Sequence, residues 1–134
     1  MREFYAASAA ETELIGEKLG KTLKKDDVVF LLGELGAGKT AITRGIAKGM
    51  GIDANVKSPT FTIVREYADR LFHFDLYRIK SEEELFDIDF ESYLLRGTCV
   101  IEWPQAAYGI AEATVRVDIA YEGEGRRITL TRDI

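Results

Sequence analysis

The spacing of apolar residues in the first part of the chain predicts a helix, a buried strand and a second helix. Ser8 and Glu11 stand three residues apart, which is the form of a helix-capping box. The apolar positions that follow recur at helical spacing, at Leu14, Ile15, Leu19 and Leu23. An uninterrupted apolar run at 28–32 predicts a buried strand. Helical spacing then returns at Ile42, Ile46 and Met50, and Gly49 and Gly51 predict the end of that helix.

The rest of the chain reads mainly as strands. Apart from a short acidic helix that starts at Ser81, the pattern predicts strands at 61–66, 71–76, 98–101, 114–121 and 126–131. The last two are separated only by a glycine-rich segment at 122–125, so we expect them to form an antiparallel hairpin. This mixture of elements predicts a sheet that is parallel in its centre and antiparallel elsewhere, with flanking helices.

The segment between the buried strand and the second helix reads Gly-Glu-Leu-Gly-Ala-Gly-Lys-Thr, which is the phosphate-binding pattern G-x-x-x-x-G-K-[ST]. Its glycines allow backbone N–H groups to approach phosphate oxygens, and the following helix points its positive N-terminus at the same anion. Lys39 offers a charge to the β- and γ-phosphates, and the Thr40 hydroxyl is a ligand for Mg²⁺. The predicted nucleotide-binding residues of the loop are Gly33, Glu34, Leu35, Gly36, Ala37, Gly38, Lys39 and Thr40.

Together these patterns predict one α/β domain that spans residues 1–134. We expect a three-layer P-loop NTPase-like domain, with a mixed sheet, helices on both faces and a C-terminal antiparallel hairpin. A chain of this length buries about two-thirds of its unfolded surface, which is enough for a stable core.

Composition narrows the class of protein. The net charge of −5 argues against a large nucleic-acid footprint, although a local basic patch is compatible with it. One cysteine and one histidine exclude a disulfide framework and a zinc site built from these residue types. The longest apolar runs are far shorter than the ~20 residues of a membrane span, and the N-terminus lacks an apolar signal segment. We therefore expect a cytoplasmic protein.

Two acidic residues stand where magnesium-nucleotide chemistry needs a carboxylate. Asp75 ends the run Leu-Phe-His-Phe, and Glu102 ends the run Cys-Val-Ile. Ligands of open α/β sheets bind at the carboxyl ends of such strands. Each acid alone can be read as a helix cap or a solvated residue, but Thr40 by itself cannot hold the metal.

A hydroxyl-rich segment and a tryptophan form the next candidates. The segment Ser58-Pro59-Thr60-Phe61-Thr62 can sense a γ-phosphate and its magnesium, as nucleotide switch loops do. From composition alone, a turn that leads into an edge strand is the favoured interpretation of this segment. Trp103 follows Glu102 and is suited to contact a base or a partner, or to pack in the core.

Other reactive or charged side chains are read as structural. His73 lies inside a predicted strand and is expected to be a packed, hydrogen-bonded residue rather than a base. Cys99 lies in another predicted strand and is expected to be inert. Three arginines flank the predicted site and suit either phosphate neutralisation or the solvated surface: Arg65, Arg70 and Arg78.

Four motifs together resemble those of a known family. Gly33–Thr40, Ser58–Thr62, His73–Arg78 and Ile101–Pro104 occur in the order and spacing of the bacterial TsaE (YjeE) proteins. The resemblance covers residues 5–133, and the last three motifs are quite specific to the family. Its members are small P-loop ATPases required for threonylcarbamoyladenosine formation in tRNA.

The resemblance implies roles for individual residues. It implies catalytic roles for Lys39, Asp75, Glu102 and Thr60, and metal binding by Thr40, Glu102 and Asp75. Glu102 would be the second magnesium ligand, Asp75 would assist the metal or the water, and Thr60 would belong to a switch-like loop. Thr12 resembles a family position near the nucleotide, and Trp103 matches the family tryptophan; both are grouped with the nucleotide-binding residues.

The resemblance also implies cofactors and partners. The cofactors would be ATP and Mg²⁺. The partners would be a threonylcarbamoyl transferase subunit of the TsaD type and its inactive paralogue of the TsaB type, with tRNA contacted only indirectly or weakly, and no membrane. Hydrolysis would reset this complex between turnovers. Because no motif places an arginine as an internal finger, we expect a weak, partner-stimulated ATPase.

Three other functions fit parts of the pattern. A small P-loop kinase needs an acceptor-binding segment and an arginine-bearing lid, whereas the stretch 79–97 is short and acidic. A GTPase needs an Asn-Lys-x-Asp stretch, which the sequence lacks. A nucleotide-gated binding module with incidental ATPase activity is not separated from a true ATPase by sequence.

Overall fold

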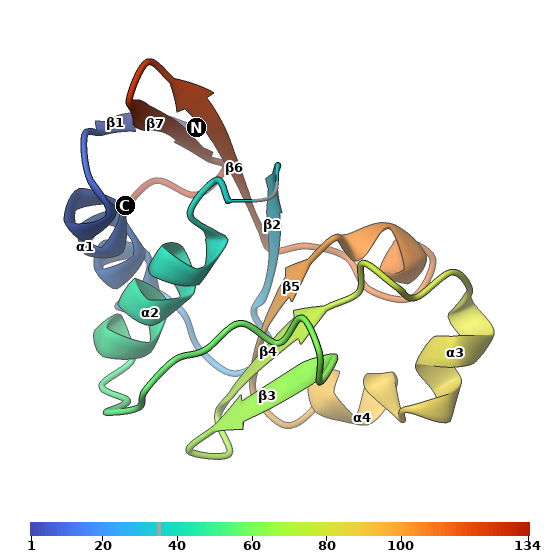
Figure 1. Ribbon diagram of the computed structural model, residues 1–134. Helices are drawn as coiled ribbons and strands as arrows, with labels where there is room; N and C mark the ends of the chain where they lie inside the picture. Colours follow the sequence, from blue (N-terminus) through green and yellow to red (C-terminus); the bar gives the residue numbers. More distant parts are fainter. Residues whose placement is uncertain (35) are drawn as a thin grey trace.

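The structure, a computed structural model, describes residues 1–34 and 36–134 (Figure 1). Its strands are β1 (Arg2–Ala6), β2 (Val28–Gly33), β3 (Val64–Tyr67), β4 (Leu71–Asp75), β5 (Thr98–Glu102), β6 (Val115–Glu122) and β7 (Gly125–Leu130). Its helices are α1 (Ala9–Gly20), α2 (Lys39–Gly49), α3 (Glu82–Asp87), α4 (Phe90–Leu94) and the 3₁₀-helix η1 (Pro104–Ala107). Within the described residues, no helix is long and apolar enough to cross a membrane.

All strands join one mixed sheet in the order β1-β7-β6-β2-β5-β4-β3. The central strands β6, β2, β5 and β4 run parallel. Antiparallel strands complete both edges, because β3 pairs with β4, and β7 pairs with β6 and β1. The parallel centre, the antiparallel remainder and the C-terminal hairpin confirm the sheet expected from the sequence. Parallel strands align their carboxyl ends along one edge, and the candidate site lies there.

Helices cover both faces of the sheet, which confirms the three-layer prediction (Figure 1). On one face, α1 and α2 bury Ile15, Leu19, Ile42 and Ile46 against sheet residues that include Val29 and Val100. On the other face, α3 and α4 bury Leu85 and Phe90 against an aromatic layer that includes Phe72 and Phe74. Alternation along β2 explains this division, since Val29 and Leu31 face the first layer while Val28 and Phe30 face the second.

The backbones of α1 and α2 touch along four glycines, which we call the glycine seam: Gly16, Gly20, Gly45 and Gly49. A Cβ atom added at Gly45 would overlap the carbonyl oxygen of Glu13, and one added at Gly16 would overlap that of Ile42. The sequence pattern treats Gly20 as an interruption and Gly49 as a stop signal. The structure confirms Gly49 as the end of α2, whereas α1 ends at Gly20 instead of continuing past it. Both glycines also take part in the seam, because only a residue without a side chain permits this close an approach.

Several sequence expectations differ from the structure. The strand predicted at 61–66 begins only at Val64, because the N–H groups of Thr62 and Ile63 both donate to the carbonyl of Pro59 and close a turn. Leu14 is expected on the buried helix face but is 58% exposed. The sequence analysis did not find β1, α4 or η1, which are short and carry little periodic pattern.

Cys99 is buried in β5, in keeping with the expected packing role. Burial raises the pKa of its thiol to about 12, and its Sγ lies 3.6 Å from the carbonyl oxygen of Tyr93. The thiol is therefore uncharged at neutral pH and unreactive in the folded protein.

Asp27 joins three segments at the edge of the sheet opposite the candidate site. Its carboxylate accepts hydrogen bonds from the Lys24 backbone N–H at 3.0 Å, the Thr114 hydroxyl at 2.8 Å and the Arg132 guanidinium at 2.8 Å. Burial alone would raise the pKa of Asp27, but these hydrogen bonds outweigh it and lower the pKa below its usual value of 3.8.

The glycine seam makes a prediction about stability. Gly45→Ala should lower the free energy of unfolding by about 3 kcal/mol or more, because the new methyl group meets rigid backbone and forces the helices apart. Helix propensity alone would give the opposite sign, since alanine is the better helix former. Gly109→Ala is the matched control, because there the added Cβ meets only the flexible end of the Glu82 side chain. Urea unfolding measures both, and equal stability of the two variants would exclude a rigid seam.

Asp27 makes a prediction about pH. Because its pKa is lower in the folded than in the unfolded state, its contribution is complete above pH 3.8 and disappears as the pH falls through the folded pKa. At pH 7, Asp27→Ala should lower the free energy of unfolding by about 1.5–3 kcal/mol. The difference from the wild type should shrink in acid. Asp53→Ala, at an exposed aspartate, is the control. A stability difference between Asp27→Ala and the wild type that stays constant from pH 7 to pH 2.5 would contradict the prediction.

Candidate functional site

The loop between β2 and α2 presents backbone donors to a ligand. Gly36 and Gly38 have φ angles of 78° and 113°, which are left-handed conformations that glycine adopts without strain. Gly38 is the N-cap of α2 and has no side chain to accept a hydrogen bond from the first turn. The first N–H groups of α2 therefore lack an intrahelical acceptor and point toward the space beyond the helix. An anion placed there would satisfy them.

Lys39, the first residue of α2, holds its ammonium group beside this loop. The side chain is buried, and its Nζ donates to the carbonyl oxygen of Gly33 at 2.9 Å. The same Nζ lies 4.0 Å from the centre of the Trp103 ring. Burial lowers the pKa of Lys39, while the negative charges of Glu102 and Asp75 act in the opposite direction. The ammonium is thus held by weak partners that a phosphate can replace.

Asp75 and Glu102 lie next to each other at the carboxyl ends of β4 and β5, as the sequence predicts. They are paired in the parallel register, and Glu102 is also paired with Leu31 on β2, two residues before the loop. Both are buried. Asp75 Oδ1 accepts the Tyr77 N–H at 2.9 Å, and Glu102 Oε2 lies 2.5 Å from His73 Nε2. His73 is therefore the packed, hydrogen-bonded residue that its strand position predicts.

A cavity of about 330 Å³ joins these groups. It is lined by Gly36, Gly38, Lys39, Thr40, Ser58, Thr60, Asp75, Glu102 and Trp103. The oxygen atoms of Thr40, Asp75 and Glu102 suit Mg²⁺, which prefers oxygen ligands. Among the described residues there is no group of three or more His, Cys, Asp or Glu that could hold a metal by itself. This donor set therefore fits a Mg²⁺ ion that takes its remaining ligands from phosphate and water.

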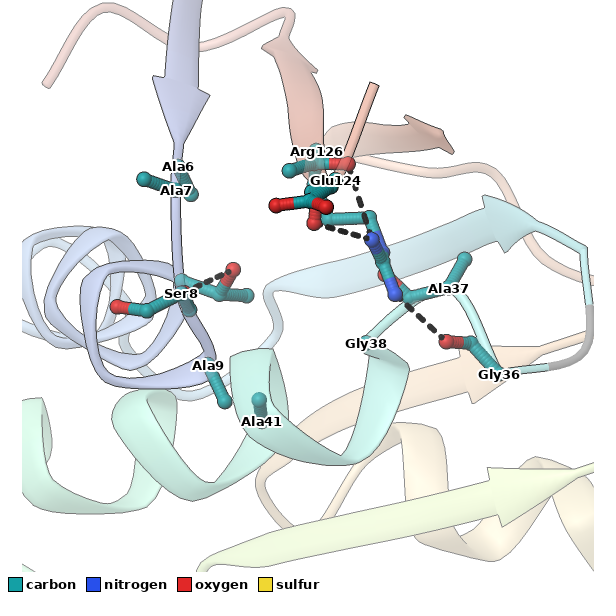
Figure 2. Close-up of a pocket in the computed structure, with 12 residues that line it drawn as sticks. Ala6, Ala7, Ser8, Ala9, Gly36, Ala37, Gly38, Ala41, Glu124 and Arg126 are labelled. Carbon is teal, nitrogen blue, oxygen red and sulfur yellow. Dashed lines mark hydrogen bonds between the residues drawn. The ribbon is translucent and has the colours of Figure 1, made fainter. Parts of the chain in front are cut away.

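A second cavity, of about 200 Å³, lies beside the loop, between the start of α1 and the C-terminal hairpin (Figure 2). It is lined by the start of α1, including Ser8 and Thr12, by Ala41 of α2, and by Glu124 and Arg126 of the hairpin. Gly36 and Gly38 line both cavities. The two cavities therefore meet at the loop glycines, and an elongated ligand with its anionic part on the loop has space on either side.

Arg126 is a site residue that the sequence analysis missed. Its Nε donates to the carbonyl oxygen of Ala37 at 3.0 Å, and one terminal nitrogen donates to the carbonyl oxygen of Gly36 at 3.4 Å (Figure 2). The guanidinium also stacks 4.2 Å from the Tyr121 ring centre. These contacts tie the loop to β7. No local sequence pattern predicts these contacts, because the loop and Arg126 are about 90 residues apart.

The segment 58–62 forms a turn at the mouth of the larger cavity. The Ser58 and Thr60 hydroxyls lie 2.5 Å apart, and Arg65 Nε donates to the Ser58 carbonyl at 3.2 Å. The following residue, Ile63, accepts the Asp75 N–H at 2.8 Å through its carbonyl. The turn is thus anchored directly to the strand end that carries Asp75, which links the predicted switch segment to a predicted catalytic acid.

The structure brings most of the predicted site residues together. Lys39, Thr40, Thr60, Asp75, Glu102 and Trp103 line the larger cavity, and Thr12 and Ala37 line the smaller one. Gly33 accepts the Lys39 ammonium. Glu34 is exposed and lines neither cavity, and Leu35 lies outside the described residues. Arg70 does not flank the site, because it donates to the Met50 carbonyl at the opposite edge of the sheet.

Comparison with known proteins decides the family. The family model described as "Threonylcarbamoyl adenosine biosynthesis protein TsaE" matches residues 6–129. The chain belongs to the TsaE family. The resemblance inferred from the four sequence motifs is thereby confirmed.

Curated relatives and a solved structure agree with TsaE membership. The chain is similar to the tRNA threonylcarbamoyladenosine biosynthesis protein TsaE of Haemophilus influenzae, with 44% identity over 80% of this chain and 71% of the relative. It is 40% identical to the protein of the same name from Treponema pallidum, over 90% of this chain and 92% of the relative. The crystal structure of Bacillus subtilis YdiB matches with a TM-score of 0.78 and 30% identity, over 96% of this chain and 83% of that one.

Arg126 makes a prediction about the loop of this TsaE-family chain. Arg126→Ala removes donors from the Gly36 and Ala37 carbonyls, so the loop should open more often. Backbone amides at 36–39 should exchange hydrogen about 5- to 10-fold faster, which corresponds to the loss of one ordinary hydrogen bond. Arg127→Ala is the matched control, because Arg127 is exposed and pairs with Glu3 and Glu122 instead. Equal exchange rates in the two variants would show that Arg126 does not stabilise the loop.

Proposed function

We propose that this chain is the ATP-hydrolysing component of the machinery that forms threonylcarbamoyladenosine in tRNA. The observation that carries the proposal is the convergence of Lys39, Thr40, Asp75 and Glu102 on one cavity at the N-terminus of α2. Membership of the TsaE family supports the link to this modification. The cytoplasmic location expected from the sequence stays a prediction.

In the proposed reaction, each residue has a defined task. The phosphates of ATP lie on the N–H groups of the loop and of the first turn of α2. Lys39 exchanges the Gly33 carbonyl for phosphate oxygens, and this exchange also moves its charge off the Trp103 ring. Thr40 and Glu102 would hold Mg²⁺, which would supply positive charge for the phosphates. The carboxylate of Asp75 would assist the metal or orient the attacking water.

The smaller cavity supports the choice of a nucleoside triphosphate. It adjoins the loop glycines, is not lined by Asp75 or Glu102, and is lined mostly by residues with short side chains. A nucleoside attached to the bound phosphates would extend into it. Thr12 and Ala41 lie there, so Thr12 would contact the nucleotide as its resemblance to a family position implies.

Slow hydrolysis by the isolated chain also follows from the site. Phosphoryl transfer needs a positive charge on the transition state besides the lysine and the metal. Arg126 is already bound to loop carbonyls, and the described residues place no arginine in the lining of the larger cavity. Phe61 and Tyr77 expose aromatic rings near this cavity, so a partner that covers them would close it. We propose the TsaD-type transferase and its TsaB-type paralogue as these partners, with tRNA contacted only indirectly.

The kinase alternative is less well supported than hydrolysis. The stretch 79–97 forms α3 and α4, which bury Leu85 and Phe90 against the sheet face opposite α1 and α2. It therefore does not lie over either loop cavity as an arginine-bearing lid would.

The two acids should respond differently to substitution. Glu102→Ala should raise the Mg²⁺ concentration needed for half-maximal ATP binding at least tenfold, because a direct ligand is lost. Asp75→Asn keeps an acceptor for the Tyr77 N–H, so nucleotide affinity should change little while hydrolysis slows by about 100-fold. Phosphate release and calorimetric titration measure the two effects, and Glu112→Ala, at an exposed acid, is the control. Normal hydrolysis in both variants would place the site elsewhere.

Reconstitution tests the proposed function itself. This chain, the transferase, its paralogue and tRNA, supplied with an activated threonylcarbamoyl donor and Mg-ATP, should give many modified tRNAs per complex. Lys39→Ala should stop after about one turnover because phosphate binding is lost. Sustained modification with Lys39→Ala, or without this chain, would refute the proposal. The Asp75→Asn variant distinguishes a true ATPase from a nucleotide-gated binding module. Full modification despite slow hydrolysis would indicate the binding module.

A further inference from the structure

We propose that His73 is a positioning residue for the metal-binding carboxylate of Glu102. The inference rests on the proposed function, because it takes Glu102 as a Mg²⁺ ligand. It assigns His73 a task that packing alone would not require: its ring donates a hydrogen bond that selects one orientation of the carboxylate.

The backbone of β4 holds His73 rigidly. The residue is paired with Arg65 on β3 and with Val100 on β5, so strands lie on both sides of it. Its side chain is fully buried, on the sheet face that packs against α1 and α2. An imidazole in this position has little freedom to turn, and a partner that it binds is therefore held in a defined place.

The contact with Glu102 is short and involves one specific oxygen. His73 Nε2 lies 2.5 Å from Glu102 Oε2, which is closer than in an ordinary N–H···O hydrogen bond. The other carboxylate oxygen, Oε1, accepts no hydrogen bond from the described residues. Glu102 also lines the larger cavity together with Thr40. The ring thus binds one carboxylate oxygen and leaves the other without a hydrogen-bond donor from the described residues.

The second ring nitrogen indicates where the proton lies. His73 Nδ1 is buried and has no hydrogen-bond partner among the described residues. A proton on Nδ1 would be a buried donor without an acceptor, and Nε2 would then present its lone pair to a carboxylate. A proton on Nε2 is instead directed at Glu102 Oε2 and has an acceptor there, so the geometry makes Nε2 the donor in this contact. The environment therefore selects the tautomer that orients the carboxylate.

A plain packing role predicts different behaviour from a positioning role. If His73 only filled space, an apolar side chain of similar size would serve as well in this largely apolar layer. If it orients Glu102, a replacement must donate a hydrogen bond from the position of Nε2. Glutamine can do so, because its side-chain amide nitrogen reaches about as far as Nε2, whereas leucine cannot.

The test compares His73→Gln with His73→Leu. Calorimetry with a non-hydrolysable ATP analogue measures Mg²⁺ affinity, and the emission of Trp103, the chain's single tryptophan, gives a second signal. His73→Leu should weaken Mg²⁺ binding 10- to 100-fold with nucleotide affinity in EDTA unchanged, and His73→Gln should stay within about threefold of wild type. Wild-type Mg²⁺ affinity in His73→Leu, or an equal loss in both variants, would overturn the inference.

Two further measurements keep the outcome unambiguous. In a Glu102→Ala background, His73→Leu should cause no additional loss of Mg²⁺ affinity, since the group it orients is gone. Long-range ¹⁵N NMR of the unmodified protein at neutral pH reads the tautomer directly, because His73 is the only histidine. A ring without a proton on Nε2 would refute the inference without any variant having to fold. If the wild type binds no Mg²⁺ with the nucleotide analogue, the proposed function fails instead.

Discussion

Direct backbone contact between α1 and α2 is the constraint on which the position of the candidate site depends. The glycine seam lets the carbonyl oxygens of each helix occupy space that side chains would otherwise fill. Because α2 begins at Lys39, the distance between the helices sets where the lysine and the first free N–H groups lie. The same contact brings Thr12 of α1 beside Gly38. A wider helix pair would move Thr12 away from the loop and open the smaller cavity that the start of α1 lines.

The sheet and the helix bring opposite charges to one place. Parallel strands end together, so Asp75 and Glu102 become neighbours without being close in sequence. Lys39 arrives from the helix layer, and its burial is tolerated because these carboxylates favour its charged form. Around this centre each group has a second contact that restricts it: the Gly33 carbonyl for Lys39, the Tyr77 N–H for Asp75 and the His73 ring for Glu102. The loop itself is tied to β7 by Arg126.

Much of the fold follows from local pattern. The helix after Ser8 was predictable because the capping serine and the apolar spacing agree, and the Ser8 side chain does accept the Glu11 N–H. The hairpin was predictable from alternation on either side of a glycine turn. Local reasoning failed where a turn competed with alternation, as at 61–63, and where an element was too short for periodicity, as in β1 and α4. It also did not predict the glycine seam, because the contact of a glycine with another helix cannot be recognised from the residues around that glycine.

The sequence by itself determined the family, the phosphate-binding loop and the two acids that end β4 and β5, because each of these features is encoded by consecutive residues or by the end of an apolar run. Tertiary structure alone decided which side chains touch them. The contacts of His73 with Glu102 and of Arg126 with the loop join strands and turns that are 29 and about 90 residues apart. Contacts of this kind depend on strand order and register. The hydrophobic pattern of a strand indicates which of its faces is buried, but it does not indicate which distant strand pairs with it.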